Sequence, residues 1–185
     1  MDFVELTSNY AMKSIFVLDT TDWMIAGIIA FILICVAMRL AQQKRICNTQ
    51  AVAAVLLATY LFLIFCSTVI ARPNLGVHSY QLQPFWSYKE VMEKGRTDLL
   101  AENLLNVGML VPIGFLLPLL SRRIKFRHVI FAAFLISYTI ELSQLIFCKG
   151  LFELVDDPFH NVLGAIVGYG IYRAAWLCVL EKQYH

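Results

Sequence analysis

The chain has 185 residues, of which 59% are hydrophobic and 15% charged, and its mean hydropathy is +0.69. This composition is typical of an integral membrane protein and excludes an ordinary soluble domain. The formal net charge of +2 is too small, and the basic residues are too dispersed, to indicate a nucleic-acid partner.

Residues 1–22 show no charged region followed by an apolar region and a cleavage site, so we do not predict a removable signal peptide. We expect this segment outside, with the weakly amphipathic "YAMKSIFVL" on the membrane surface. The five cysteines lie in scattered positions without C-x-x-C spacing. They predict neither a zinc site nor a disulfide framework, and we expect no metal and no cofactor.

Apolar runs predict the crossings, since a helix needs about 20 apolar residues to span roughly 30 Å of hydrocarbon. Five runs qualify, and they predict an all-α integral membrane protein, a bundle of about five helices in one domain at 23–180. An outer loop at 71–102 and a short tail at 181–185 complete the chain. The predicted spans are residues 23–40, 51–70, 103–121, 129–148 and 161–180.

Basic residues follow the first and third predicted spans, which places both of these short loops on the cytoplasmic side. The N-terminus is therefore expected outside and the C-terminus inside. The outer loop is too long for a bare turn, and its "YKEVMEKG" is compatible with a short helix. The basic residues that set this orientation are Arg39, Lys44, Arg45, Arg122, Arg123, Lys125 and Arg127.

A polar stripe runs along the fourth span, where Ser137, Glu141, Gln144 and Cys148 share one helical face. Glu141 lies roughly 18 Å along this span, in the outer half of the bilayer. A carboxylate there costs at least about 2.5 kcal/mol, so it needs protonation, a partner or a wet cavity. Glu141 is the strongest functional candidate. The alternative is a neutral acid that hydrogen-bonds to amide side chains of neighbouring helices.

The fifth span begins outside with Asp156, Asp157, His160 and Asn161. For the aspartates the alternative to a functional role is stabilisation of the helix N-terminus, and for His160 it is simple solvation. Arg72, at the outer end of the second span, is equally consistent with a headgroup anchor.

Small residues predict close helix packing in the third and fifth spans. "GAIVG" is a small-xxx-small motif that lets another helix backbone approach closely. "VGMLVPIGFLLP" carries prolines and glycines that loosen the third span. The predicted packing residues are Pro112, Gly114, Gly164 and Gly168.

Four of the predicted spans direct polar residues to the same outer region, which predicts an outward-facing ligand site. No nucleophile elbow, phosphate-binding loop or zinc-protease motif accompanies it, so a binding protein is favoured over an enzyme. If a reaction occurs, the catalytic candidates are Glu141, Asp157 and His160. The predicted ligand-binding residues are Arg72, Asn103, Asn106, Glu141, Gln144, Asp156, Asp157, His160 and Asn161.

Three blocks, "ENLLNVGMLVPIGFLLPLL", "SYTIELSQLIF" and "VDDPFHNVLGAIVGYGIY", together resemble the VanZ-like membrane proteins, and "ARPN" and "QPFWSY" extend the likeness upstream. The family often has an arginine before its aspartate pair, where this chain has Lys149. By the resemblance, the family positions are Asn103 or Asn106, Pro112, Gly114, Glu141, Gln144, Asp157, Asn161 and Gly164.

The resemblance implies a multi-pass protein of the bacterial plasma membrane, because the family is named for an accessory protein of resistance to teicoplanin, a glycopeptide with a lipid tail. It implies a place of action more than a reaction. Three hypotheses follow. The first is binding of an envelope lipid, a lipid-linked group or teicoplanin. The second is an intramembrane enzyme that modifies an envelope lipid with Glu141 and Asp157. The third is a small proton-coupled transporter, which the lack of an inverted repeat disfavours.

Overall fold

The computed structural model describes residues 20–72, 74, 76, 78–149, 151–153 and 155–181. Helices make up most of this part, which confirms the predicted all-α membrane fold. The expected surface stretch "YAMKSIFVL" lies outside the described residues. The long helices are α2 (Thr20–Gln42), α3 (Asn48–Phe65), α5 (Asp98–Leu116), α6 (Phe126–Ile146) and α7 (Asp156–Glu181).

Membrane crossing is indicated for four of these helices within the described residues. The segments that are long and apolar enough are Trp23–Gln42, Asn48–Ile70, Asp98–Leu120 and Phe126–Ile146. Helix α7 has 26 residues, which at about 1.5 Å per residue is enough to cross a bilayer, although it carries acids in its first turn. The fifth crossing and the orientation stay predictions.

Several helices extend beyond the apolar runs from which they were predicted. Helix α5 begins at Asp98, inside the predicted outer loop, and α7 begins at Asp156. Helical hydrogen bonding can continue through polar residues beyond the point where an apolar run ends, and a span predicted from apolar residues alone is therefore shorter than its helix. The C-terminal ends of two helices change their hydrogen-bonding pattern. Helix α3 continues as the π-helix η1 (Cys66–Ile70), and α5 continues as the 3-10 helix η2 (Leu117–Leu120).

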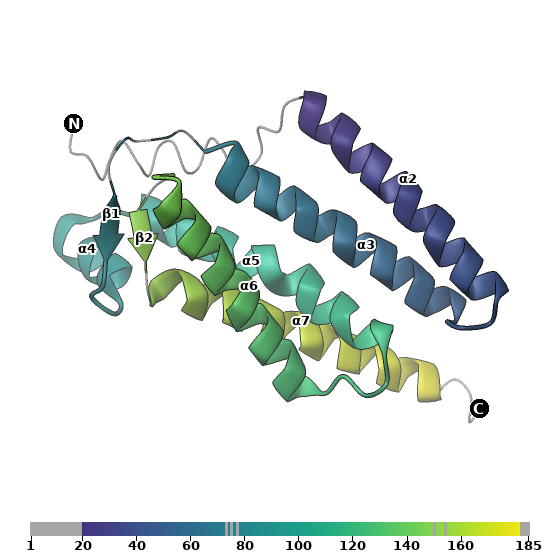
Figure 1. The fold of residues 1–185 in the computed structure, drawn as a ribbon. Coiled ribbons are helices and arrows are strands. Elements are labelled where there is room, and N and C mark those ends of the chain that lie inside the picture. The colour runs from purple at the N-terminus through teal and green to yellow at the C-terminus, as the bar shows by residue number, and fades with distance from the viewer. Residues whose placement is uncertain are drawn as a thin grey trace.

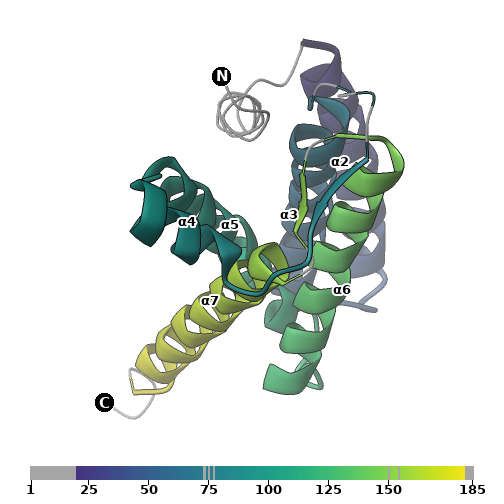
Figure 2. The same cartoon turned by 90° about the vertical axis from the view of Figure 1, so that its left-hand side faces the viewer.

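The predicted outer loop is ordered by a short helix and a strand that lie beside the connection from α6 to α7 (Figures 1 and 2). Helix α4 (Trp86–Lys94) covers most of the "YKEVMEKG" stretch. Strand β1 (Ser79–Gln81) pairs in parallel with β2 (Leu151–Glu153), with Tyr80 opposite Phe152. The sequence analysis predicted no strands, because three residues are too few to show alternation. The pairing ties the outer loop to the start of α7.

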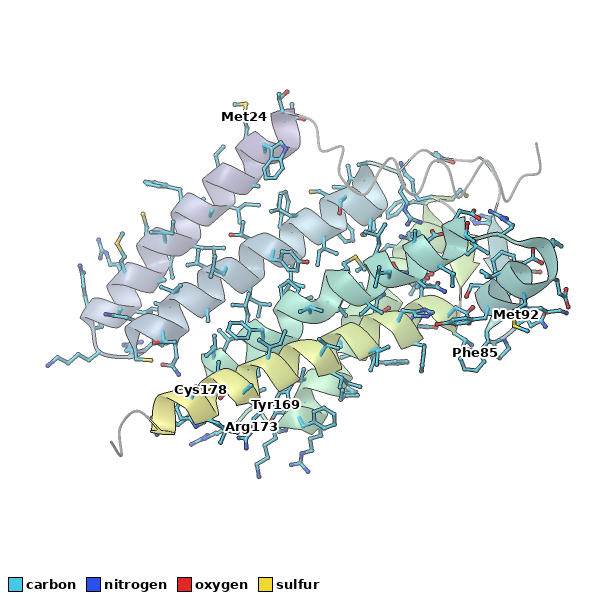
Figure 3. The ribbon with its side chains drawn as sticks, turned by 180° about the vertical axis from the view of Figure 1, so that it is seen from behind. Met24, Phe85, Met92, Tyr169, Arg173 and Cys178 are labelled. Carbon is cyan, nitrogen blue, oxygen red and sulfur yellow. The ribbon has the colours of Figure 1, made fainter. Side chains whose placement is uncertain are left out.

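The two basic connections lie at one end of the bundle. Figure 1 shows the α2–α3 and α5–α6 connections near the C-terminal end of α7, with α4, β1 and β2 at the opposite end. In Figure 3, Phe85 and Met92 lie at this opposite end, far from Arg173 and Cys178. A common end for both basic loops is what the positive-inside rule requires.

The centre of the bundle is the pair α5 and α7, which contact each other more extensively than any other pair of described elements, while α2 packs mainly on α3. Glycine makes the closeness of α5 and α7 possible. A Cβ added to Gly164 would overlap the Val107 carbonyl, and one added to Gly168 would lie 2.9 Å from the Phe115 backbone nitrogen. A Cβ on Gly114 would likewise overlap the Ala165 backbone. The two helices therefore meet backbone to backbone.

We expect Met92 to lie outside and Arg123 inside in cells. In a cysteine-free background, Met92→Cys should react with an impermeant thiol reagent applied to intact cells, because Met92 is 86% exposed. Arg123→Cys should react only after the membrane is permeabilised. The reverse pattern would invert the orientation.

Gly168→Leu should destabilise the protein by at least about 1–3 kcal/mol, because the larger side chain must push α5 and α7 apart. The measurement is the midpoint of thermal unfolding in detergent, together with the yield of folded protein. Gly170→Leu is the matched control, since nothing lies within 4 Å of a Cβ built on Gly170. Equal stability of the two variants would show that the close approach does not matter.

Candidate functional site

The Asp156 carboxylate holds the N-terminus of α4 at the end of the bundle where α5 and α7 begin. Its Oδ1 accepts a hydrogen bond from the Phe85 N–H at 2.6 Å, and its Oδ2 accepts from the Ser87 N–H at 3.0 Å and the Ser87 hydroxyl at 2.8 Å. Asn103 Nδ2 donates to the same hydroxyl oxygen at 3.1 Å. The first N–H groups of a helix lack partners within it and favour a negative charge. Asp156 thus supports the N-terminus of α4 in addition to its own helix.

His160 is held at both ring nitrogens. Nδ1 lies 2.6 Å from the Asp156 carbonyl oxygen, and Nε2 lies 2.7 Å from the Tyr88 hydroxyl oxygen. A carbonyl can only accept, so Nδ1 carries a proton, and in the neutral ring Nε2 accepts from Tyr88. His160 is 2% exposed, so the simple solvation considered from the sequence does not describe it. Asp156, His160, Tyr88, Ser87 and Asn103 form what we term the α4 anchor.

Glu141 and Asp157 form a hydrogen bond between their carboxyl groups, which links α6 to α7. Ionised carboxylates offer only acceptors, so this bond requires a proton on one of the two groups. Asn106 Nδ2, from α5, donates to Asp157 Oδ1 at 2.5 Å. Glu141 is 2% exposed. The pair and Asn106 therefore join three helices, and the bond between the two carboxyl groups requires one proton.

Amide side chains extend the hydrogen bonds one helical turn above and one turn below the carboxyl pair. Because α6 and α7 run in opposite directions, Ser137 of α6 lies opposite Asn161 of α7. Asn161 Nδ2 donates to Ser137 Oγ at 2.7 Å, deeper in the bundle than the carboxyl pair. Gln144 Nε2 donates to the Thr68 carbonyl at 3.0 Å. Thr68 belongs to the π-helix η1, and π-helical turns are frequent at functional sites.

The residues Asn106, Ser137, Glu141, Gln144, Asp157 and Asn161 form what we term the carboxyl network. Buried polar atoms without a hydrogen-bond partner occur in and near it. In the described part of the chain they include Arg72 Nε, Gln144 Oε1 and Asn161 Oδ1. Such atoms are rare in folded proteins, and each costs about 1–3 kcal/mol when it lacks a partner. The two amide oxygens can accept hydrogen bonds, and the arginine nitrogen can donate one.

The groups that interact with Asp157 are mainly acidic. Three other carboxyl groups, those of Glu102, Glu141 and Asp156, interact with Asp157, and Arg72 and His160 are the basic groups that do so. Within the described residues, Arg96 is paired instead with Asp98, at 2.6 Å between Nη2 and Oδ2. More acidic than basic groups therefore lie around Asp157.

The structure brings the predicted ligand-binding residues to one end of the bundle but divides them between two sets of contacts. Asn103, Asp156 and His160 belong to the α4 anchor. The Arg72 side chain interacts with Asp157 through charge. The Arg72 backbone carbonyl accepts a hydrogen bond from Lys149 Nζ at 2.7 Å. The other predicted residues, Asn106, Glu141, Gln144, Asp157 and Asn161, belong to the carboxyl network.

The site residues predicted from the sequence did not include Thr68, Ser87, Tyr88 or Glu102. Ser87 and Tyr88 are the last residues of "QPFWSY", and Glu102 is the first residue of "ENLLN". Both segments belong to the family resemblance, which was the available signal for these three residues. Nothing in the sequence marks Thr68, whose backbone carbonyl is the contacting group. Among the described residues, no group of three or more His, Cys, Asp or Glu side chains could hold a metal ion.

An apolar groove lies between α2 and α3, away from the carboxyl network. Its volume is ≈ 520 Å³, and it is lined by residues such as Met38, Ala51 and Val55. It reaches Asn48, where α3 begins, whereas the carboxyl network contacts η1 beyond the other end of α3.

A family model described as VanZ/LLP1 matches residues 51–178, which is more than half of the chain. The matched region includes both sets of contacts and leaves out α2. No curated protein and no solved structure matches the chain.

Asp156→Asn should loosen α4 without unfolding the bundle, because an amide has one acceptor oxygen in place of two and cannot receive all three donors. We expect hydrogen exchange of the Phe85 and Ser87 amides to accelerate about tenfold or more, as loss of one charged hydrogen bond implies. Glu93→Gln, at an exposed position of the same helix, is the control. Unchanged protection in Asp156→Asn would show that Asp156 does not hold α4.

Proposed function

The chain belongs to the VanZ/LLP1 family, and we propose that it binds the polar group of an envelope lipid or lipid-linked component at the carboxyl network. In this proposal it acts in the bacterial plasma membrane with the network facing outward. By family resemblance, its effect is lower susceptibility to teicoplanin-type lipoglycopeptides.

The observation that carries the proposal is the carboxyl pair of Glu141 and Asp157 among polar atoms that lack partners. Carboxyl groups at membrane depth cost several kcal/mol unless a bond or a ligand offsets this cost. Within the bundle the side-chain amide nitrogens of Gln144 and Asn161 donate hydrogen bonds, while their amide oxygens have no partner. A packing network alone would not need unpaired oxygens at both positions. A bound polar group would supply their partners.

Separate support comes from the rigidity of the surroundings. The α4 anchor and the β1–β2 pair fix the outer loop across the ends of α5 and α7. A preorganised site loses less conformational entropy when a ligand binds. This favours a defined binding position over nonspecific contact with lipid.

The second candidate is an enzyme that modifies an envelope lipid, and the shared proton of the carboxyl pair favours it. One protonated and one ionised carboxyl in contact can act as general acid and general base. In this case the protonated carboxyl group of the Glu141–Asp157 pair would donate a proton to the lipid, and the ionised one would abstract a proton from it.

Two substitutions of Glu141 separate the candidates. Glu141→Gln keeps a donor for Asp157 but cannot ionise, so binding should survive while proton transfer should not. Glu141→Ala removes the bond and should abolish both. In a glycopeptide-sensitive Gram-positive host, we expect the unmodified chain to raise tolerance to teicoplanin more than to vancomycin. We expect Glu141→Gln to retain this difference and Glu141→Ala to lose it.

Abundance in the membrane must be matched first, with the exposed Glu93→Gln as a control for loss of an acid. Loss of the teicoplanin effect in both Glu141 variants would favour the enzyme. Full retention in both would show that Glu141 only holds helices together, and the binding proposal would be wrong.

A further inference from the structure

We infer that the polar group bound at the carboxyl network is zwitterionic: a protonated primary amine next to a phosphodiester, as in an ethanolamine phospholipid headgroup. This inference rests on the proposed function and narrows its ligand class. It follows from the kinds of polar atom that lack partners, together with the local charges.

The unpaired acceptor calls for a donor-rich group. Gln144 is 3% exposed, and its carbonyl oxygen has no partner. The orientation of Gln144 is determined, because the Thr68 carbonyl can accept only from its amide nitrogen. A primary ammonium has three N–H donors and a positive charge. It would meet the Gln144 oxygen beside the carboxyl pair, which is an environment suited to a cation.

The unpaired donor calls for an acceptor on the same ligand. Arg72 Nε is buried and lacks a hydrogen-bond partner, although the side chain lies close enough to Glu102 and Asp157 to interact through charge. Its guanidinium is planar and suits phosphate oxygens. A phosphodiester at Arg72 would also lie beside the helix end where headgroup phosphates are found.

Simpler ligands satisfy only part of this arrangement. A lone phosphate would leave the Gln144 oxygen without a donor and would approach Glu102, Glu141 and Asp157. A lone metal cation would leave Arg72 Nε without an acceptor. A quaternary choline headgroup has the right charges but no N–H to donate. A primary amine with a phosphodiester is the headgroup that supplies both kinds of partner.

The test uses the purified full-length chain, stripped of lipid in detergent, and short-chain phospholipids that differ only in the headgroup. Affinity is measured from the concentration dependence of thermal stabilisation, which reports ligands that bind the folded state. The series is dioctanoyl phosphatidylethanolamine, its N-methyl and N,N-dimethyl forms, and phosphatidylcholine, with phosphatidylglycerol as the anionic comparison.

We expect affinity to fall along this series, with phosphatidylethanolamine bound about tenfold or more tightly than phosphatidylcholine, the factor for one charged hydrogen bond. Phosphatidylglycerol should also bind more weakly. Arg72→Gln should weaken binding of every phospholipid by a similar factor, because it removes the contact to the shared phosphate. Arg122→Gln, at the opposite end of the bundle, should leave the affinities unchanged.

The outcomes separate this inference from the proposed function. Equal affinity for the ethanolamine and choline lipids, or tightest binding of phosphatidylglycerol, would overturn the amine assignment and leave lipid binding intact. Absence of saturable stabilisation by any of these phospholipids would overturn the inference. If lipid-linked envelope precursors also failed to stabilise the chain, the proposed function would be overturned with it.

Discussion

The hydrogen bond between the Glu141 and Asp157 carboxyl groups is the interaction on which the rest of this end of the bundle, where α5 and α7 begin, depends. It keeps a carboxyl pair in a region where an isolated charge is costly, and it needs one proton to exist. Asn106 reaches Asp157 only because α5 and α7 approach backbone to backbone. Glycine at 164 and 168 thus serves the polar network as well as the packing, because a short asparagine side chain could not bridge a wider gap.

Adjacent aspartates have different roles at the start of α7. Consecutive residues of a helix project about 100° apart, so Asp156 and Asp157 face different neighbours. Asp156 accepts three hydrogen bonds from Phe85 and Ser87 and holds α4. Asp157 faces Asn106 and Glu141 within the bundle. One residue thus orders the outer loop, while the next joins the membrane helices.

Helical spacing was enough to predict the polar face of each helix, but not which groups on different helices meet. The sequence placed Ser137, Glu141 and Gln144 on one face of the fourth span, and the structure shows this face against α7 and η1. The contact of Asp156 with Ser87 spans 69 positions and has no local signal. The β1–β2 pair is too short to show periodicity, and η1 departs from the helical period that the prediction assumed.

The central claim, that one proton is shared by Glu141 and Asp157, can be tested by infrared difference spectroscopy of the purified chain. We expect a protonated-carboxyl C=O band at neutral pH that shifts in D₂O. Glu141→Gln and Asp157→Asn should each remove it, because the new amide donates to the remaining carboxylate and no proton is needed. A band that persists in both variants, or the absence of any protonated-carboxyl band in the unmodified chain, would contradict the claim.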